Sequence, residues 1–181
     1  RPRPTKEAMR EEGSKMSAET LQTARLRLRS PSRSDAERLA ELANNAAVAR
    51  MSTRIPHPYA LTDAESFLGH LEKGEEHVFA IEHGGDGLVG MIGLHDTGRL
   101  GPEIGYWLGQ PDWGRGLATE AAQAVLDWAA RTGRRCVVSS HFADNPASGA
   151  VLIKAGFLYT GEVTRTFSTA RSAEVDTRQM V

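Results

Sequence analysis

The stretch that decides the fold is residues 103–120, which read EIGYWLGQPDWGRGLATE. A short β-type run, Glu103–Leu108, passes through a glycine-rich segment directly into the start of a long helical pattern. Glycines at this junction let backbone N–H groups converge, and the helix end adds roughly half a positive charge. The pattern therefore predicts a site for the phosphate or pyrophosphate of a nucleotide-like cofactor.

This loop differs from two common phosphate-binding loops. Residues 114–119, GRGLAT, have neither the four-residue gap nor the Gly-Lys-Ser/Thr of a Walker A loop. No second β-α-β unit follows Thr119, which weakens a dinucleotide-binding interpretation. On spacing alone, a turn that needs glycine only to begin a helix explains the segment equally well.

Outward from this unit, periodicity predicts the remaining elements. Strands are expected at 23–29, 77–82, 88–95, 103–108, 136–140, 157–167 and 174–181. Capping boxes at Ser34–Glu37 and Thr62–Glu65 each predict a helix start, and further helices are expected at 117–132 and 146–155. Asn145 should cap the last of these, and Gly133 and Gly156 should end helices. The order β-α-α-β-β-β-α-β-α-β-β indicates an α+β (mixed α/β) domain.

Composition excludes several classes of protein. The 181 residues suit one domain, and the net charge of −1 supplies no broad field for nucleic acid. No apolar run approaches a membrane span, and the charged start lacks the features of a signal peptide, so we expect a cytoplasmic protein. Residues 1–20 are expected to form a disordered tail, and 21–181 the domain. The single cysteine, Cys136, excludes an internal disulfide and is expected to be a buried thiol in a strand, and the six histidines show no metal-ligand spacing, so no metal is expected.

Several ordered motifs together resemble the GNAT acyl-CoA N-acyltransferases, most closely the RimJ/RimL-type branch. They are EIGYWL (103–108), WGRGLATEA (113–121), and NPAS (145–148) with KAGF (154–157). The likeness extends over residues 21–181, because TARLRLR (23–29) and IPHPY (55–59) also resemble segments of that branch. The resemblance implies a central, mostly antiparallel sheet of about seven strands flanked by about four helices.

The resemblance also implies acetyl-CoA as donor. Its pyrophosphate would lie on the loop from Trp113 to Ala118, and its pantetheine arm would pair with the backbone of Tyr106 to Leu108. Trp113 departs from the family's Arg or Gln at the first loop position. The expected cofactor-binding residues are Tyr106, Trp107, Leu108, Trp113, Gly114, Arg115, Gly116, Leu117, Ala118, Thr119 and Asn145.

Amine acetylation needs a base, because an amine attacks a thioester only after losing a proton. At pH 7 this costs roughly 4.6 kcal/mol for a lysine of pKa ~10.4, but only about 1.4 kcal/mol for an α-amino group near ~8. Glu103 matches the position from which many family members deliver a carboxylate, so it is the expected base. His95 is held in reserve for that role, although a histidine at a surface turn is the simpler interpretation.

The leaving thiolate has a conjugate acid of pKa ~8.5, so a strong general acid is optional. Many GNAT enzymes carry a tyrosine two residues before the Lys of the Lys-x-Gly-Phe segment, where this chain has Leu152. In the RimJ/RimL branch, the serine matched by Ser148 is thought to hydrogen-bond the cofactor sulfur. Ser148 is therefore the second expected catalytic residue, and a helical serine satisfied by backbone is the alternative.

The acceptor is expected to be a primary amine that attacks directly in a ternary complex. His57, Tyr59 and His95 are expected to line its cleft. Branch resemblance favours a peptide or protein N-terminal α-amine. The alternatives are a small-molecule amine, such as an antibiotic or polyamine, and a non-catalytic acyl-CoA sensor. RimJ/RimL-like proteins are often dimers, so a homodimer is a candidate assembly. No nucleic-acid or membrane partner is expected.

Overall fold

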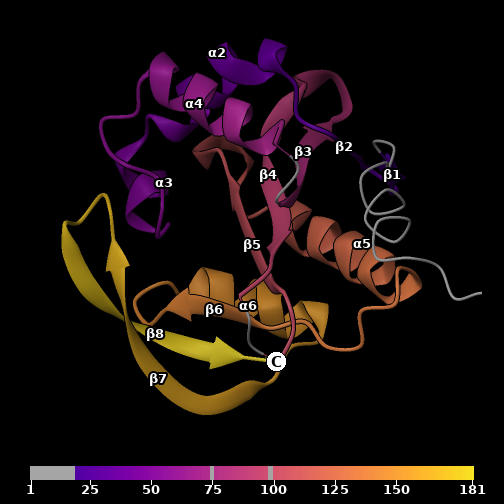
Figure 1. The fold of residues 1–181 in the computed structure, drawn as a ribbon, viewed down its shortest axis with the longest axis vertical. Coiled ribbons are helices and arrows are strands. Elements are labelled where there is room, and N and C mark those ends of the chain that lie inside the picture. The colour runs from indigo at the N-terminus through magenta and orange to yellow at the C-terminus, as the bar shows by residue number, and fades with distance from the viewer. Residues whose placement is uncertain (1–18, 74–75, 98–99) are drawn as a thin grey trace, which may run out of the picture.

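A five-stranded antiparallel sheet forms the centre of the computed structural model, which describes residues 19–73, 76–97 and 100–181. Its strands follow one another in chain order (Figure 1): β1 (Leu21–Gln22), β2 (Leu26–Arg29), β3 (His77–His83), β4 (Leu88–His95) and β5 (Glu103–Leu108). β4 is buried along almost its whole length, as expected for an apolar strand covered on both faces.

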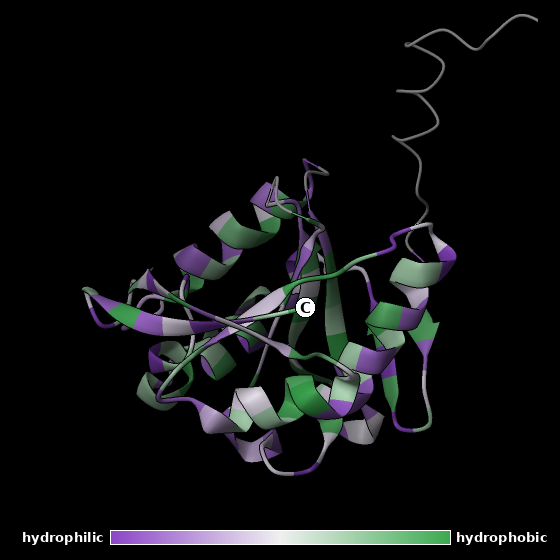
Figure 2. Cartoon of the chain, turned by 90° about the horizontal axis from the view of Figure 1, so that it is seen from below, coloured by the Kyte–Doolittle hydropathy of each residue, from purple (hydrophilic) through white to green (hydrophobic). Residues whose placement is uncertain are grey.

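A second sheet of three strands continues from the edge of the first. Its order is β6 (Ser139–Phe142), β8 (Ala173–Met180) and β7 (Tyr159–Ser168). A parallel bridge between Glu103 and Val138 joins the two sheets, and the Ile104 N–H donates to the Val138 carbonyl at 2.9 Å. Beyond this bridge β6 pairs with β8, so β5 and β6 start together and then separate. The hairpin of β7 and β8 projects from the molecule with a mixed hydrophilic and hydrophobic surface (Figure 2).

Helices cover both faces of the first sheet and create two cores. α5 (Leu117–Arg131) covers one face, and α2 (Ala36–Ala43) and α4 (Leu61–Leu71) cover the other. α3 (Ala46–Arg50) follows α2, and α6 (Pro146–Ala155) packs against α5 and β6. The core on the α5 side includes Leu26, Leu28, Ile81, Ile92, Val125 and Trp128. The core on the α2–α4 side includes Leu39, Leu42, Ala64, Leu68 and Met91.

The predicted α+β class is confirmed, and several elements match their predicted bounds. β4, β5 and α6 agree with the prediction to the residue, and α5 ends one residue early. The Asn145 side chain accepts from the Ser148 N–H, and Gly156 ends α6 with φ +108°. The described residues form eight strands in two sheets and five α-helices, because β1 and α3 were not predicted. No helix in the described ranges is both long and apolar enough to cross a membrane. The predicted disordered tail lies, except for its last two residues, outside the described part of the chain.

The first predicted strand is wrong in its first half. Thr23 closes a tight turn, since its N–H donates to the Leu26 carbonyl and its hydroxyl accepts from the Leu26 N–H. The strand therefore starts at Leu26, and Ala24, within the predicted strand, is exposed. A two-residue strand, β1, precedes the turn instead.

Both predicted capping boxes are displaced. The Asp35 carboxylate accepts from the Ser32 N–H, so a 3-10 turn precedes α2, and the Asp63 carboxylate accepts from the Ala60 N–H, so α4 begins at Leu61. In each case the aspartate that follows the predicted serine or threonine reaches back three residues. This moves the start of α4 towards the N-terminus and places a 3-10 turn, Arg33–Asp35, before α2.

The strand predicted at 136–140 starts three residues later. The chain before it pairs only at Val138, and the ladder with β8 runs from Ser139 to Phe142. Cys136 therefore precedes β6 and is half-buried instead of fully buried. Its carbonyl lies 2.2 Å from where a Cβ on Gly101 would stand, so only glycine permits this approach of the segments that lead into β5 and β6.

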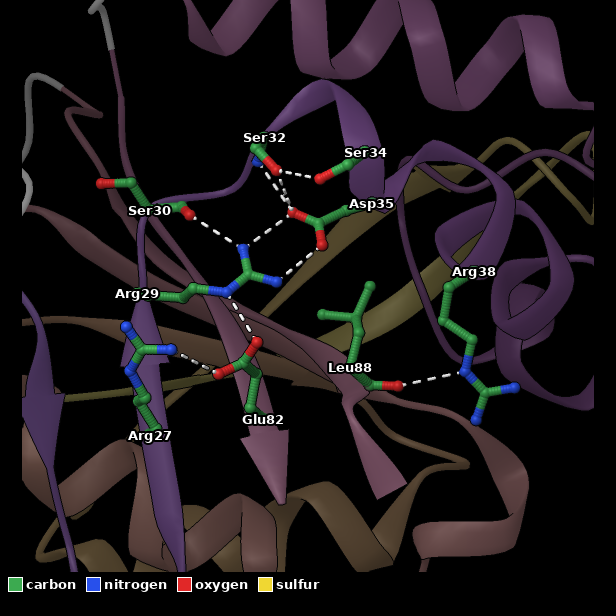
Figure 3. Close-up of polar contacts among 9 residues, drawn as sticks. All are labelled: Arg27, Arg29, Ser30, Ser32, Ser34, Asp35, Arg38, Glu82 and Leu88. Carbon is green, nitrogen blue, oxygen red and sulfur yellow. Dashed lines mark hydrogen bonds and ion pairs between the residues drawn. The ribbon is translucent and has the colours of Figure 1, made fainter. Parts of the chain in front are cut away.

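An ion-pair network fixes the entry into α2 (Figure 3). The Arg29 guanidinium donates two hydrogen bonds to Asp35, at 2.8 and 2.6 Å, and a third to Glu82 on β3. Burial alone would raise the pKa of Asp35, but the bonds from Arg29 and from the Ser32 N–H outweigh it and lower the pKa below its usual value. Arg29 is thus a structural residue that connects β2, β3 and α2.

We expect Asp35→Asn to destabilise the fold by about 2 kcal/mol at pH 7, since it removes one of the two carboxylates that bond the partly buried Arg29 guanidinium. Because the folded-state pKa is lowered, the difference should be complete above the unfolded value of ~3.9 and disappear as pH falls through the folded value. Urea denaturation at several pH values measures it. Glu72→Gln, which breaks an exposed pair with Arg33 of similar length, should leave stability unchanged. Equal effects of the two variants would contradict the assignment.

Candidate active site

A cavity of about 540 Å³ opens where β5 and β6 separate. Residues of β4, β5, β6 and β8 and of the α2–α4 region contribute to its walls, together with the start of α6. Within the described ranges, its charged lining consists of three carboxylates and one guanidinium, those of Asp63, Glu76, Glu103 and Arg54. The balance of these charges favours a cationic ligand.

Glu103 lies at the strand junction and lines the cavity. The first residue of β5, it pairs with Val138 on one side and with His95 on the other. The Ser140 hydroxyl of β6 donates to Glu103 Oε1 at 2.7 Å. A carboxylate held in this way keeps its second oxygen for a substrate proton.

A chain of polar groups continues from Glu103 across the sheet. His95 is its cross-strand neighbour, and His95 Nδ1 lies 3.1 Å from Glu76 Oε2. Arg54 donates to the other Glu76 oxygen at 3.0 Å. Burial lowers the pKa of His95 and outweighs the carboxylates of Glu76 and Glu103, so the imidazole is neutral at pH 7. Burial alone would raise the pKa of Glu76, but Arg54 and His95 lower it.

The loop before α4 contributes one of its two predicted residues to the cavity. Tyr59 is buried, lines the cavity, and donates its N–H to Asn44 Oδ1. Burial, with the nearby charge of Asp63, raises the pKa of Tyr59 to about 12. His57 is exposed and is not among the lining residues, because the apolar Ile55 and Tyr59 turn inwards and leave the residues between them more exposed. The expectation that His57 lines the cleft is therefore not supported.

Ser148 and Asn145 lie together at the start of α6 and both line the cavity. The Asn145 side-chain oxygen accepts from the Ser148 N–H at 3.2 Å, which fixes the first turn of the helix. The Ser148 hydroxyl lies 2.9 Å from the hydroxyl of Tyr106, which comes from β5. Tyr106 thus contributes a side chain to the site as well as backbone, which sequence reasoning did not anticipate.

The outer edge of β5 presents backbone groups towards the gap between the sheets. Gly109 N–H donates to Val89, and the alternation of an antiparallel ladder then turns the backbone of Tyr106 and Leu108 away from β4. The Leu108 carbonyl accepts from the Trp113 indole N–H at 2.8 Å. The Tyr106 N–H and C=O and the Leu108 N–H face the gap, as strand-like pairing with an extended ligand requires.

Beyond β5, the glycine loop turns into α5. Gly114 and Gly116 have φ of +74° and +76°, and a Cβ on Gly114 would meet no atom within 4 Å. The N–H groups of Leu117, Ala118 and Thr119 belong to the first turn of α5, where no intrahelical partner exists for them. The Leu117 side chain is buried in the core, so only its backbone can reach a ligand.

Arg25, in the turn between β1 and β2, is hydrogen-bonded to this loop. Its guanidinium donates to the Arg115 carbonyl at 2.9 Å and to Glu120 Oε2 at 2.7 Å. Arg25 and Arg27 are exposed and Arg29 is half-buried, and the guanidinium of each is bonded to a carboxylate.

The Arg115 side chain turns away from the helix start. It donates to the buried Asp112 at 2.6 Å and lies near Asp86 and His83. The ligand atoms of His83, Asp86 and Asp112 lie within 4.8 Å of one another, but the Arg115 guanidinium already balances the carboxylates. This arrangement suits an ion pair that shapes the loop.

Arg171 lies in the turn between β7 and β8 and contacts Phe142, one of the residues that line the cavity. Its guanidinium donates to the Arg50 carbonyl and to both oxygens of Asp144, and it stacks over the Phe142 ring. The Thr169 N–H donates to the Thr53 carbonyl beside it. These bonds hold the hairpin against the loop that follows α3.

Sequence reasoning missed Arg54, Glu76, Ser140 and Arg171. Glu76 could have been found from the register of the β3–β4 hairpin. Residues paired outwards from the Gly84–Gly87 turn place Glu76 opposite His95 when the bulge at Ile81 is included. Arg171 carries no local signal, because its partners are 27 and 121 residues away in the chain.

Comparison with known proteins identifies the family. The model of the acetyltransferase (GNAT) domain matches residues 25–158. The ribosomal-protein-serine acetyltransferase of Escherichia coli (strain K12) is 36% identical over 80 residues, which cover 42% of this chain and 44% of that protein. The chain thus matches less than half the length of this relative.

Solved structures share the fold. A GNAT-family acetyltransferase from Bacillus anthracis superimposes with a TM-score of 0.78 at 21% identity, over 90% of this chain and 96% of that chain. The ribosomal L7/L12 α-N-protein acetyltransferase RimL, in complex with coenzyme A, gives 0.77 at 20% identity over the same shares. The chain therefore belongs to the GNAT acetyltransferase family and is similar to its RimJ/RimL-type ribosomal-protein acetyltransferases.

Proposed function

We propose that this GNAT enzyme transfers the acetyl group of acetyl-CoA to the N-terminal α-amine of a peptide or protein. The observation that carries the proposal is the arrangement along β5. Its first residue, Glu103, lies in the acidic cavity, and the glycine loop follows its last residue, roughly 17 Å away. One extended donor along the open edge of β5 can therefore reach both ends.

The residues present suit acetyl-CoA. The open glycine loop and the first turn of α5 offer N–H groups to a pyrophosphate, and the outward groups of Tyr106 and Leu108 offer a strand edge to the pantetheine arm. Bound acetyl-CoA supplies a thioester carbonyl as electrophile. Glu103 accepts the proton that the amine must lose, and Ser140 orients the carboxylate for that purpose.

The cavity charge supports an amine acceptor. Carboxylates outnumber guanidiniums in its lining, so a protonated amine is attracted before it gives up its proton. An α-amino group near pKa ~8 then costs about 1.4 kcal/mol to deprotonate at pH 7, roughly a third of the cost for lysine. The ribosomal-protein relatives named above act, by their names, on proteins, and RimL on an α-amine. Polyamines and other small amines belong in the same acceptor screen.

Gly114→Ala should lower coenzyme A affinity by about tenfold or more, because its Cβ would project into the loop that receives the pyrophosphate. Gly133→Ala is the matched control. Gly133 has φ +89°, equally open space, and a position at the other end of α5. Both variants should lose similar thermal stability, but only the first should lose affinity by titration calorimetry. Equal affinities would place the pyrophosphate elsewhere.

Glu103→Gln should reduce kcat/KM for an α-amine peptide by about 10²–10⁴-fold at pH 7, because the amide cannot take the amine proton. The remaining rate should keep rising with pH up to the amine pKa of ~8, because a larger fraction of the amine is then already deprotonated in solution. Mass spectrometry of peptides with either the α-amine or the lysine blocked measures rate and acceptor together. Glu162→Gln, on exposed β7, should behave as wild type. An unchanged Glu103→Gln rate would remove Glu103 from the base role.

A further inference from the structure

Two hydroxyl groups meet on the opposite face of β5 from Glu103. Tyr106 Oη lies 2.9 Å from Ser148 Oγ and 3.1 Å from the Ser148 carbonyl oxygen. Tyr106 is three residues after Glu103, so the pleat of the strand directs the two side chains to opposite faces. Both hydroxyl-bearing residues line the cavity.

Ser148 is held from two directions. Its N–H donates to the Asn145 side chain, and its hydroxyl contacts Tyr106. A serine in the first turn of a helix commonly satisfies its hydroxyl on nearby backbone. Here the partner comes from 42 residues away on another element, which fixes the hydroxyl at the cavity wall.

Many GNAT enzymes carry a tyrosine that acts as general acid, but the corresponding position in this chain is apolar. Leu152 occupies it and is fully buried in the core beside α5. Tyr106 therefore supplies a tyrosine hydroxyl near the start of α6 by a different route, from β5. Its hydroxyl contacts the Ser148 hydroxyl at the cavity wall.

We propose that Tyr106 is a positioning residue that donates a hydrogen bond to Ser148 Oγ, so that Ser148 directs its own hydroxyl proton to the sulfur of the departing coenzyme A thiolate. This inference rests on the proposed acetyl transfer. The amine nitrogen bonds to the thioester carbon, the carbon–sulfur bond breaks, and its electron pair stays on sulfur. The acceptor ammonium loses one proton to Glu103 before the attack. The second proton leaves the nitrogen to solvent as the amide forms, and the thiolate leaves as an anion stabilised by Ser148.

Tyr106 does not itself give up its proton. Burial raises its pKa to about 12. A thiol has a pKa of ~8.5, so proton transfer from this phenol to the thiolate is unfavourable by roughly 10³-fold. The pair acts by hydrogen bonding to developing charge, which requires fixed orientation and no net proton transfer.

The test is a double-mutant cycle with Tyr106→Phe, Ser148→Ala and the double variant, assayed with saturating acetyl-CoA and an α-amine peptide. Phe keeps the ring in its packing and removes only the hydroxyl. We expect Tyr106→Phe to lower kcat about tenfold, the worth of one good hydrogen bond, with an unchanged KM for acetyl-CoA and an unchanged pH profile. In the Ser148→Ala background, the same substitution should have no further effect.

Tyr159→Phe is the matched control. It also removes a phenol hydroxyl close to α6, one that contacts His141, and should leave kcat unchanged. An unchanged kcat for Tyr106→Phe, or an equal loss in the Ser148→Ala background, would overturn the positioning role while leaving acetyl transfer intact. A wild-type rate for Ser148→Ala would show that neither Ser148 nor Tyr106 contributes to stabilising the leaving thiolate. Coenzyme A binding without turnover by the wild-type enzyme on every amine would overturn the proposed function itself.

Discussion

The bond from the Ile104 N–H to the Val138 carbonyl is the constraint on which the site depends. It joins β5 and β6 at their beginnings, and β6 then pairs with β8 instead of continuing along β5. Backbone groups that leave a sheet need other partners. The separation therefore creates both the cavity and a strand edge that can bind an extended ligand. Gly101 permits this junction, because any Cβ there would collide with the Cys136 carbonyl.

The pleat of β5 divides the chemistry between two faces. Glu103 and Trp107 lie on the side of α2 and α4, where the carboxylates of the cavity are found, and Tyr106 lies on the side of α5 and α6. In the proposed reaction, proton removal from the acceptor and stabilisation of the leaving group would thus come from opposite sides of one strand. A register shift of a single residue would exchange them. The buried pairing of β4 with β5 prevents such a shift, since it would turn Ile104 out of the core.

Much of this arrangement could be predicted from local pattern. β4 and β5 were predicted with correct bounds from their short β-type runs, and α6 because Asn145 and Gly156 mark its two ends. Helix starts were less accurate. Ser32 and Asp35 form the capping box in place of Ser34 and Glu37, and Asp63 accepts from Ala60, whose side chain cannot cap. The bond from Ser140 to Glu103 could not be predicted, because it depends on the inter-sheet junction. Glu76 lies opposite His95 only when the bulge at Ile81 is included in the strand register. His57 and Tyr59 were indistinguishable in sequence, and only packing against α4 separated them.

Although the total charge is near zero, several arginines have a structural role. Arg25, Arg29, Arg115 and Arg171 each bond to a carboxylate, and three of them also bond to a backbone carbonyl, so they hold loops in place. Because a carboxylate neutralises each of these guanidiniums, they contribute little net positive charge to a ligand site. Positive character at the glycine loop must then come largely from the N–H groups of α5, whose direction is set by backbone and not by rotamers. Such a site is preorganised, because the loop that presents it is already fixed by Arg25 and by the Arg115–Asp112 pair before a ligand arrives.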